Sequence, residues 1–393
     1  MHLTSISASE SGKRKYPLRE PVKRAWAELG VAPNFDKTNG SIFGMTEMYE
    51  NSKDGMRQPS QSVFPLDDVE VRTKTIVRRV LFDGKAAKEV ELANGSKISA
   101  RKEVIICTGT YRTPQVLMLS GIGLAAVLEE HGIPIVHDAP KVGQNLHDHF
   151  DLYLAFRLRD PTLGYALGSP AWQSPALFKG LPWDWVVSGS LPDEIKAKHG
   201  IELKENRNYW ETISLYVPPG LPGIPFDGTH IATSTMLLIP TSRSSVTIRS
   251  INPYDAPSIN PNYISTELDR DSLVYAGRQA LELMLSTEPM KSILECEAPI
   301  SGDGFEGLEP LTATASDEAI LDRIRRTGMQ HHHSGGTAAM GDVVDTQGKV
   351  IGVRNLRIAD ASIVPIPLGG HPQATLYAMV EQLADIMVNE MME

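Results

Sequence analysis

The chain has 393 residues, of which 41% are apolar and 22% charged, and its 38 Lys and Arg against 48 Asp and Glu give a formal net charge of -10. This composition supplies a large core and more than one domain, and the acidic balance argues against a nucleic-acid or anionic-membrane partner. Two cysteines exclude a disulfide framework, and we expect Cys107, which follows an apolar run at 104–106, to be buried and inert.

The N-terminus carries no recognisable targeting signal. Residues 1–15 are polar and basic and contain no apolar stretch, so no secretory signal is predicted. No apolar run in the chain approaches the roughly 20 residues of a membrane span. We therefore expect a cytoplasmic protein without a membrane partner. The oligomeric state cannot be predicted from the sequence.

A strand-like pattern begins near residue 69. Residues 71–77 alternate between apolar and polar, and residues 80–82 lead to Asp83-Gly84, a pair that accepts positive φ. Residues 89–92 and 97–100 follow, separated by Asn94-Gly95. This spacing predicts a meander of three antiparallel strands joined by tight turns.

An apolar run at 103–107 comes next and predicts a strand buried in a parallel sheet. A turn at 108–110 follows, and Thr113-Pro114 is expected to open a helix that runs through Leu119. A meander before such a strand, turn and helix is typical of flavoprotein dinucleotide folds, in which Gly109 would let the backbone approach a nucleotide. An ordinary strand–turn–helix junction is the simpler interpretation of this segment alone.

The region 151–330 has a different character. A Pro- and Gly-rich stretch without a clear period is typical of a lid or substrate-facing loop, and also of a packed connection. Strands are predicted at 231–239 and 245–249 and a helix at 269–285. These elements indicate a second, substrate-facing lobe. The aromatic residues of the irregular stretch are Trp172, Trp183, Trp185, Tyr209 and Trp210.

The C-terminal region returns to a nucleotide-fold pattern. Residues 355–359 predict a short strand with Asp360 at its carboxyl end, the edge at which doubly wound sheets bind ligands. Residues 375–392 predict a helix, and His371 lies just before it, where the helix dipole favours the neutral ring that a base requires. The expected core face of this helix consists of Leu376, Met379, Val380, Leu383 and Met387.

Five blocks in the correct order resemble one enzyme family. They are residues 109–123, 142–149, 333–341 and 356–365, followed by His371. From about Tyr16 to its end, the chain resembles the glucose–methanol–choline (GMC) oxidoreductases, and more narrowly their fungal members.

The resemblance implies an α/β fold with two domains. One is an incomplete, doubly wound FAD-binding domain formed by residues 55–150 and 331–393. The other is an α+β substrate-binding domain with a mainly antiparallel sheet, formed by residues 15–54 and 151–330.

The resemblance also implies a catalytic pair and its partners. His333 and His371 would flank the hydroxyl of a small-molecule alcohol: one removes the proton as hydride leaves for the flavin N5, and the other hydrogen-bonds the alkoxide. The sequence does not settle which is the base. Oxygen or another acceptor would reoxidise the flavin. No metal is expected, because His331 and His332 precede His333 directly and consecutive side chains point in opposite directions.

The cofactor implied by the resemblance is FAD. The cofactor-binding positions would be Val77 beside the adenine, Thr108 and Gly109 at the adenosine, Asp360 and Ala361 near the pyrophosphate and ribityl chain, and Pro372, Gln373 and Thr375 near the isoalloxazine. Asn145, Asp148 and His149 are expected to order loops.

The sequence departs from the family in two places. Family members open with a strand, a Gly-x-Gly-x-x-Gly turn and a helix, whereas Met1 falls roughly where their second third begins. The string Gly121–Ala126 follows a predicted helix and is no nucleotide loop. We therefore expect a sheet with an open edge and weak or no FAD binding by these 393 residues. The second departure is Ser244, where the family has glycine.

Three functions are compatible with these observations. The first is FAD-dependent oxidation of a hydrophobic or aromatic alcohol, such as a polyketide intermediate of secondary metabolism, as the aromatic stretch at 160–210 suggests. The second is a flavin-free protein that uses the histidine pair for isomerisation, dehydration or cyclisation. The third is an inactive remnant or a binding partner of an intact paralogue, against which the two retained histidines argue.

Overall fold

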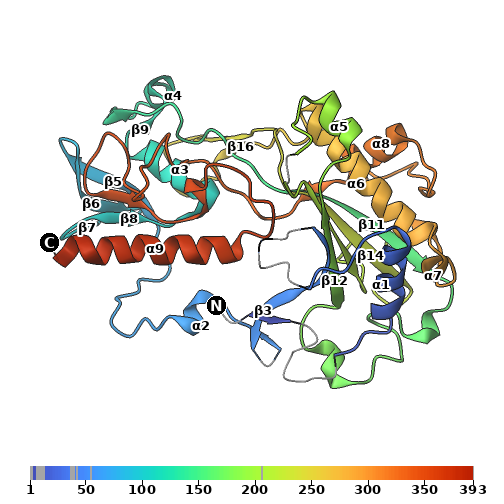
Figure 1. Cartoon of the computed structure of the whole chain (residues 1–393). Helices are drawn as coiled ribbons and strands as arrows, with labels where there is room; N and C mark the ends of the chain where they lie inside the picture. The colour runs from blue at the N-terminus through green and yellow to red at the C-terminus, as the bar shows by residue number, and fades with distance from the viewer. Residues whose placement is uncertain are drawn as a thin grey trace. The chain divides into compact units, whose positions relative to one another are not determined.

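A computed structural model of the chain describes residues 3–5, 14–35, 40, 43–53, 55–204 and 207–392. These residues form two compact units, each with its own sheet and core (Figure 1). The first unit contains residues 1–65, 150–239 and 266–331, and the second contains residues 66–149, 240–265 and 332–393.

The first unit is built on a seven-stranded antiparallel sheet. In spatial order its strands are β17 (Leu294–Ala298), β11 (Phe150–Leu158), β14 (His230–Leu237), β13 (Trp210–Leu215), β12 (Trp183–Gly189) and β2 (Gly44–Glu47), with β18 (Met329–Gln330) paired to β11. Helix α6 (Glu267–Leu285) packs against β13 and β14 (Figure 1). The other elements are β1 (Leu3–Ser5), α1 (Arg19–Glu28), β3 (Tyr49–Lys53), β4 (Met56–Arg57), α2 (Ser60–Val63), η1 (Pro161–Leu163), η2 (Pro175–Phe178), α5 (Asp193–Lys198), α7 (Glu288–Lys291) and α8 (Asp317–Thr327).

Four of the five aromatic residues named in this stretch are buried in this unit, namely Trp172, Trp185, Tyr209 and Trp210, which favours the packed interpretation for them. Trp185 lies in β12 and Trp210 in β13, and both are buried. Trp172 is also buried and stacks on Tyr16, with ring centroids 5.3 Å apart. Every residue of β13 is buried, so the apolar–polar alternation that reveals a strand is missing from its sequence.

The second unit combines a meander with a short parallel pair. The meander is confirmed: β5 (Val77–Asp83), β6 (Ala86–Leu92) and β7 (Lys97–Ser99) are antiparallel neighbours, and β8 (Val104–Ile106) pairs in parallel with β19 (Leu356–Ile358). The other elements are α3 (Gly109–Leu119), β9 (Ile122–Gly123), α4 (Ala125–Glu130), β10 (His137–Asp138), β15 (Ser245–Thr247), β16 (Ser258–Asn260), η3 (Ala361–Ile363) and α9 (Gln373–Met392).

Two predicted boundaries in this unit are wrong. Residues 71–76 are exposed and form no strand, so β5 begins only at Val77. Helix α3 begins at Gly109, and Pro114 lies inside it instead of opening it. A proline lacks the N–H that would bond the carbonyl of Thr110. The Thr337 hydroxyl donates to that carbonyl at 2.6 Å and so replaces the missing donor.

The expectation that Cys107 is buried is also wrong. Within the described residues, β8 pairs only with β19. The side chain of Ile105 is 43% exposed, and Cys107 is exposed as well. In the part of the chain that the structure describes, this apolar run therefore has one strand neighbour and one unpaired side.

Residues 240–265 belong to the second unit, whereas the sequence analysis placed them with residues 151–330. Their hydrogen bonds explain the difference. Ser244 exchanges two backbone hydrogen bonds with Leu146, at 2.8 and 3.0 Å. Arg112 of α3 donates to the carbonyl of Asp255 at 2.9 Å.

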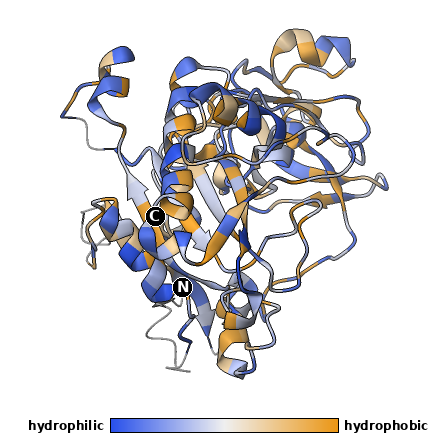
Figure 2. Ribbon diagram, turned by 90° about the vertical axis from the view of Figure 1, so that its right-hand side faces the viewer, coloured by the Kyte–Doolittle hydropathy of each residue, from blue (hydrophilic) through white to orange (hydrophobic). Residues whose placement is uncertain are grey.

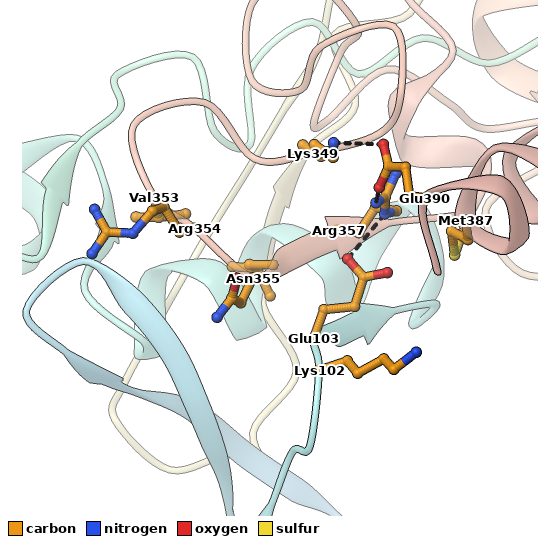
Figure 3. Close-up of a pocket in the computed structure, with 10 residues that line it drawn as sticks. Lys102, Glu103, Lys349, Val353, Arg354, Asn355, Arg357, Met387 and Glu390 are labelled. Atoms are coloured by element: carbon orange, nitrogen blue, oxygen red, sulfur yellow. Dashed lines mark hydrogen bonds and ion pairs between the residues drawn. The ribbon is translucent and has the colours of Figure 1, made fainter. Parts of the chain in front are cut away.

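An ion network centred on the buried Arg357 connects helix α9 to β19 (Figure 3). Arg357 of β19 is 1% exposed and donates to Glu103 at 3.1 Å and to Glu390 of α9 at 2.8 Å. Lys349 pairs with the same Glu390 carboxylate at 2.6 Å. The network lines a pocket of about 390 Å³ beside the starts of β8 and β19.

The apolar face of α9 is narrower than the sequence predicts. Leu383 is buried in the core of the second unit, and Met379 and Met387 pack against that core. Val380, expected on the same face, is 39% exposed. Few apolar contacts hold this helix, so the ion network contributes a large share of its attachment.

Within the described part of the chain, no helix is both long and apolar enough to cross a bilayer. Hydrophilic residues interrupt the hydrophobic ones along the helices (Figure 2).

Candidate active site

The His333 loop is held against residues 145–149 of the same unit. His147 and Gly335 exchange two backbone hydrogen bonds, at 3.1 and 2.9 Å, which form an antiparallel bridge. Gly336 has φ +89, and a Cβ at this position would lie 2.5 Å from the carbonyl oxygen of Asn145. Only glycine fits this position. The glycine three residues after His333 is therefore required by the close contact of this loop with residues 142–149.

The two predicted catalytic histidines lie side by side. The ring centroids of His333 and His371 are 4.9 Å apart, at an interplanar angle of 68°. His333 is partly buried, whereas His371 is exposed just before α9. Two imidazoles at this distance could contact one hydroxyl group together. The structure therefore brings the predicted pair together, although 38 residues separate the two in the chain, counted from 333 to 371.

Two neighbours support His333, and one of them was not predicted to touch it. The buried carboxylate of Asp148 accepts the backbone N–H of His333 at 2.8 Å, which orders the loop as expected. The Nδ1 of His149 lies 2.9 Å from the Nδ1 of His333. This ring contact goes beyond loop ordering. No local sequence pattern indicates this contact, because the two histidines are 184 residues apart in the chain.

The small cavity behind these rings is no substrate pocket. Its volume is about 20 Å³, and a space of this size holds roughly one water molecule. Among the predicted site residues, His333, Ala361 and Pro372 line it, so these three lie close together. The predicted positions Gln373 and Thr375 are exposed on the first turn of α9.

Of the remaining predicted residues, Thr108, Gly109 and Asp360 lie just after the carboxyl ends of β8 and β19. The Asp360 carboxylate accepts the N–H of Gly109 at 2.9 Å and the hydroxyl of Thr113 at 2.6 Å. Thr108 is exposed beside this turn, and its hydroxyl lies 2.9 Å from that of Thr113. Asp360 therefore joins the two strand ends. Val77 lies apart from this turn in the chain, at the start of β5, where it pairs with Leu92.

The residues at this edge fit part of an FAD molecule. Gly109 has φ +78, and a Cβ there would meet no atom within 4 Å, so a nucleotide can approach the backbone of the turn. The first turn of α9 presents N–H groups that favour negative charge. The described residues contain no Gly-x-Gly-x-x-Gly turn between a strand and a helix, so they supply only some of the contacts that FAD makes in dinucleotide folds.

Of the two histidines that precede His333 in the chain, His331 has partners of its own. His331 pairs with the buried carboxylate of Asp151 in the first unit, at 2.8 Å. His332 is exposed and has φ +58. The expectation that neither one substitutes for His333 remains a prediction.

His147 should make the stability of the second unit depend on pH. Burial, together with the charge of Arg243, lowers the pKa of His147 to about 4, although the hydrogen bond of the ring to the carbonyl of Val364, at 3.1 Å, acts in the opposite direction. Between pH 6.5 and about 4 the unfolded chain binds a proton that the native ring does not accept. We expect the free energy of unfolding to fall by about 3 kcal/mol as the pH falls through this window.

Denaturant unfolding over a series of pH values measures this loss. The variant His147→Gln retains a donor for Val364, and its stability should depend less on pH than that of the unmodified chain. The same pH dependence in both proteins would contradict the prediction.

Comparison with known proteins points to one enzyme family. The N-terminal and C-terminal models of the family described as GMC oxidoreductase match residues 3–151 and 240–379. The GMC-type oxidoreductase acuG of Aspergillus aculeatus is 40% identical over 98% of this chain and 75% of its own length. Patulin synthase of Aspergillus clavatus is 31% identical over 92% of this chain and 63% of its own length. An oxygen-dependent choline dehydrogenase of Pseudomonas savastanoi is 32% identical, over 93% of this chain and 66% of its own length.

Solved structures with the same fold include formate oxidase from Aspergillus oryzae, with a TM-score of 0.83 and 25% identity over 95% of this chain and 70% of that one. An FAD-dependent oxidoreductase from Chaetomium thermophilum has a TM-score of 0.77 and 25% identity over 95% of this chain and 72% of that one. The chain thus spans less than two thirds of the length of several relatives, such as patulin synthase with 63% covered, and up to three quarters of others, such as acuG with 75%.

Proposed function

Because this chain belongs to the GMC oxidoreductase family, we propose that it takes part in the FAD-dependent oxidation of an alcohol to a carbonyl compound, with His333 and His371 as the acid–base pair. The observation that carries this proposal is the distance of 4.9 Å between the two rings. His371 also precedes the N-terminus of α9, where the helix dipole disfavours an imidazolium.

The chain's own residues move the proton. One histidine takes the hydroxyl proton on a ring nitrogen, and the other donates a hydrogen bond to the oxygen as negative charge develops on it. Bound FAD would supply the acceptor for the hydride that leaves the carbon. Thr108, Gly109, Asp360 and Ala361 would hold it at the ends of β8 and β19, and Pro372, Gln373 and Thr375 at the start of α9, with Val77 near its adenine.

The substrate that we propose is a hydrophobic or aromatic alcohol of fungal secondary metabolism. The aromatic stretch at 160–210 was one argument for an aromatic substrate. It loses its weight, because Trp172, Trp185 and Trp210 are buried in the first unit. The relatives named patulin synthase favour it, whereas the relatives named choline dehydrogenase favour a polar substrate. Oxygen or another acceptor would complete the cycle.

Anaerobic mixing of the FAD-supplemented chain with a panel of alcohols tests the activity. Bleaching of the visible flavin band by an aryl or long-chain alcohol, and not by choline or glucose, is the expected result. Absence of bleaching by every alcohol, although FAD binds, would favour flavin-free acid–base chemistry or an inactive protein instead.

Labelling of Cys107 gives a separate measure of FAD binding. The thiol is exposed two residues before Gly109, so a maleimide should react with it. Desolvation and the Asp360 carboxylate raise its pKa, so the rate should increase as the pH rises through the alkaline range. We expect excess FAD to slow the reaction and the chain to purify with less than one FAD per protein.

The variant Cys107→Ala assigns the label, because the second cysteine, Cys296, remains in it. Stoichiometric flavin in the purified chain would contradict weak binding. Labelling that no concentration of FAD slows would contradict the proposed position of the nucleotide.

A further inference from the structure

His149 connects His333 to the backbone of the second unit. It is 3% exposed, and its ring stands at 88° to that of His333. Its Nδ1 lies 2.9 Å from the Nδ1 of His333, and its Nε2 lies 2.8 Å from the carbonyl oxygen of Leu368. The three groups thus form a continuous hydrogen-bonded chain.

An isolated backbone bridge brings the two segments together. His147 and Gly335 form this antiparallel bridge. His149 and His333 each lie two residues from it, and the Nδ1–Nδ1 contact forms beside it. The next pair in the structure, Phe150 with Gln330, has a register shifted by two residues.

The positions of the protons in this chain follow from its acceptors. The carbonyl of Leu368 has no proton to give, so the Nε2 of His149 carries one. One proton is shared in the hydrogen bond between the two Nδ1 atoms. A neutral His149 already carries its only ring proton on Nε2, so the proton between the rings belongs to His333. Burial disfavours a charged imidazolium at His149. His333 then carries its proton on Nδ1, and its lone pair is on Nε2.

We propose that His149 is a positioning residue that fixes His333 in the Nδ1–H tautomer, so that Nε2 of His333 is the atom that takes the hydroxyl proton. The kinetic part of this inference rests on the proposed function, whereas the tautomer does not. A hydrogen bond to one ring nitrogen commonly determines the role of the other.

A buried carboxylate completes the arrangement. When Nε2 takes a proton, His333 becomes an imidazolium that keeps its hydrogen bond to His149. Asp148 already accepts the backbone N–H of His333 at 2.8 Å. Its negative charge lies against the backbone of the same residue and would favour the cation as it forms.

Nitrogen NMR of the imidazole rings tests the tautomer without FAD or substrate. The signals of His333 and His149 are assigned by their loss in His333→Ala and His149→Leu. We expect a protonated Nδ1 and an unprotonated Nε2 for His333 near neutral pH. In His149→Leu the acceptor is lost, and the proton should move to Nε2.

The variant His149→Gln is the matched control. Its amide nitrogen can donate to Leu368 and its amide oxygen can accept from His333, so the tautomer should be retained. In flavin reduction by an alcohol, His149→Leu should lower the limiting rate about 10- to 100-fold with little change in KM, and His149→Gln should recover most of it.

An Nε2-protonated His333 in the unmodified chain would overturn the proposal, and so would a tautomer that is unchanged in His149→Leu. If His149→Leu fails to fold, the unmodified chain and His149→Gln still decide it. If the tautomers are as expected but no alcohol reduces the flavin, the result contradicts the proposed function. It does not contradict the role of His149 in fixing the tautomer of His333.

Discussion

Replacement of His333 by alanine is expected to slow flavin reduction by an alcohol substrate about 10²- to 10⁴-fold, the usual contribution of a positioned acid or base. The variant loses the ring nitrogen that would hold the hydroxyl proton, while His371 remains at the start of α9. Anaerobic stopped-flow of the FAD-supplemented chain measures the rate. Because His333 would act in the transition state, the limiting rate should fall more than the affinity for the alcohol.

The matched control is His131→Ala, at the end of α4 and outside the site. Its rate should remain within about twofold of the unmodified chain. FAD should still slow maleimide labelling of Cys107 in both variants, which separates lost chemistry from lost cofactor. A loss below tenfold in His333→Ala, or an equal loss in His131→Ala, would remove His333 from the mechanism.

The parts of this fold that could be predicted from sequence are those set by local chemistry. Asp83-Gly84 and Asn94-Gly95 mark the two turns of the meander, and both glycines have positive φ. The buried stripe of α6 was visible as a helical period. The family resemblance indicated His333 and His371 from sequence motifs, and the structure places their rings 4.9 Å apart.

The parts that could not be predicted depend on distant partners. Pro114 continues a helix because Thr337, 227 residues from Thr110, replaces the missing donor. His149 meets His333 across 184 residues, and only the folded chain shows that the two rings touch. The strand β13 is buried on both faces, so its sequence lacks the alternation that identifies a strand.

Arg357→Met is expected to destabilise the second unit by about 3 kcal/mol. The guanidinium is 1% exposed and bonds both Glu103 and Glu390 (Figure 3). Its removal leaves two carboxylates facing each other across an apolar side chain. Removal of one partner from a buried ion pair usually costs about 3 to 5 kcal/mol. We expect the lower value here because both carboxylates are partly exposed. Since α9 has few buried apolar residues, it should be the first element to open.

Hydrogen exchange of peptides from α9 measures this opening, which should become about 100-fold faster, the factor that corresponds to about 3 kcal/mol. Arg354→Met is the control, because Arg354 lines the same pocket but is exposed, and its effect should stay within about 0.5 kcal/mol. Tryptophan fluorescence gives an internal reference, since Trp26, Trp172, Trp183, Trp185 and Trp210 all belong to the first unit. Equal exchange in the two variants would show that apolar contacts alone hold α9. A change confined to α9 would show that the ion network holds the helix whose N-terminus follows His371.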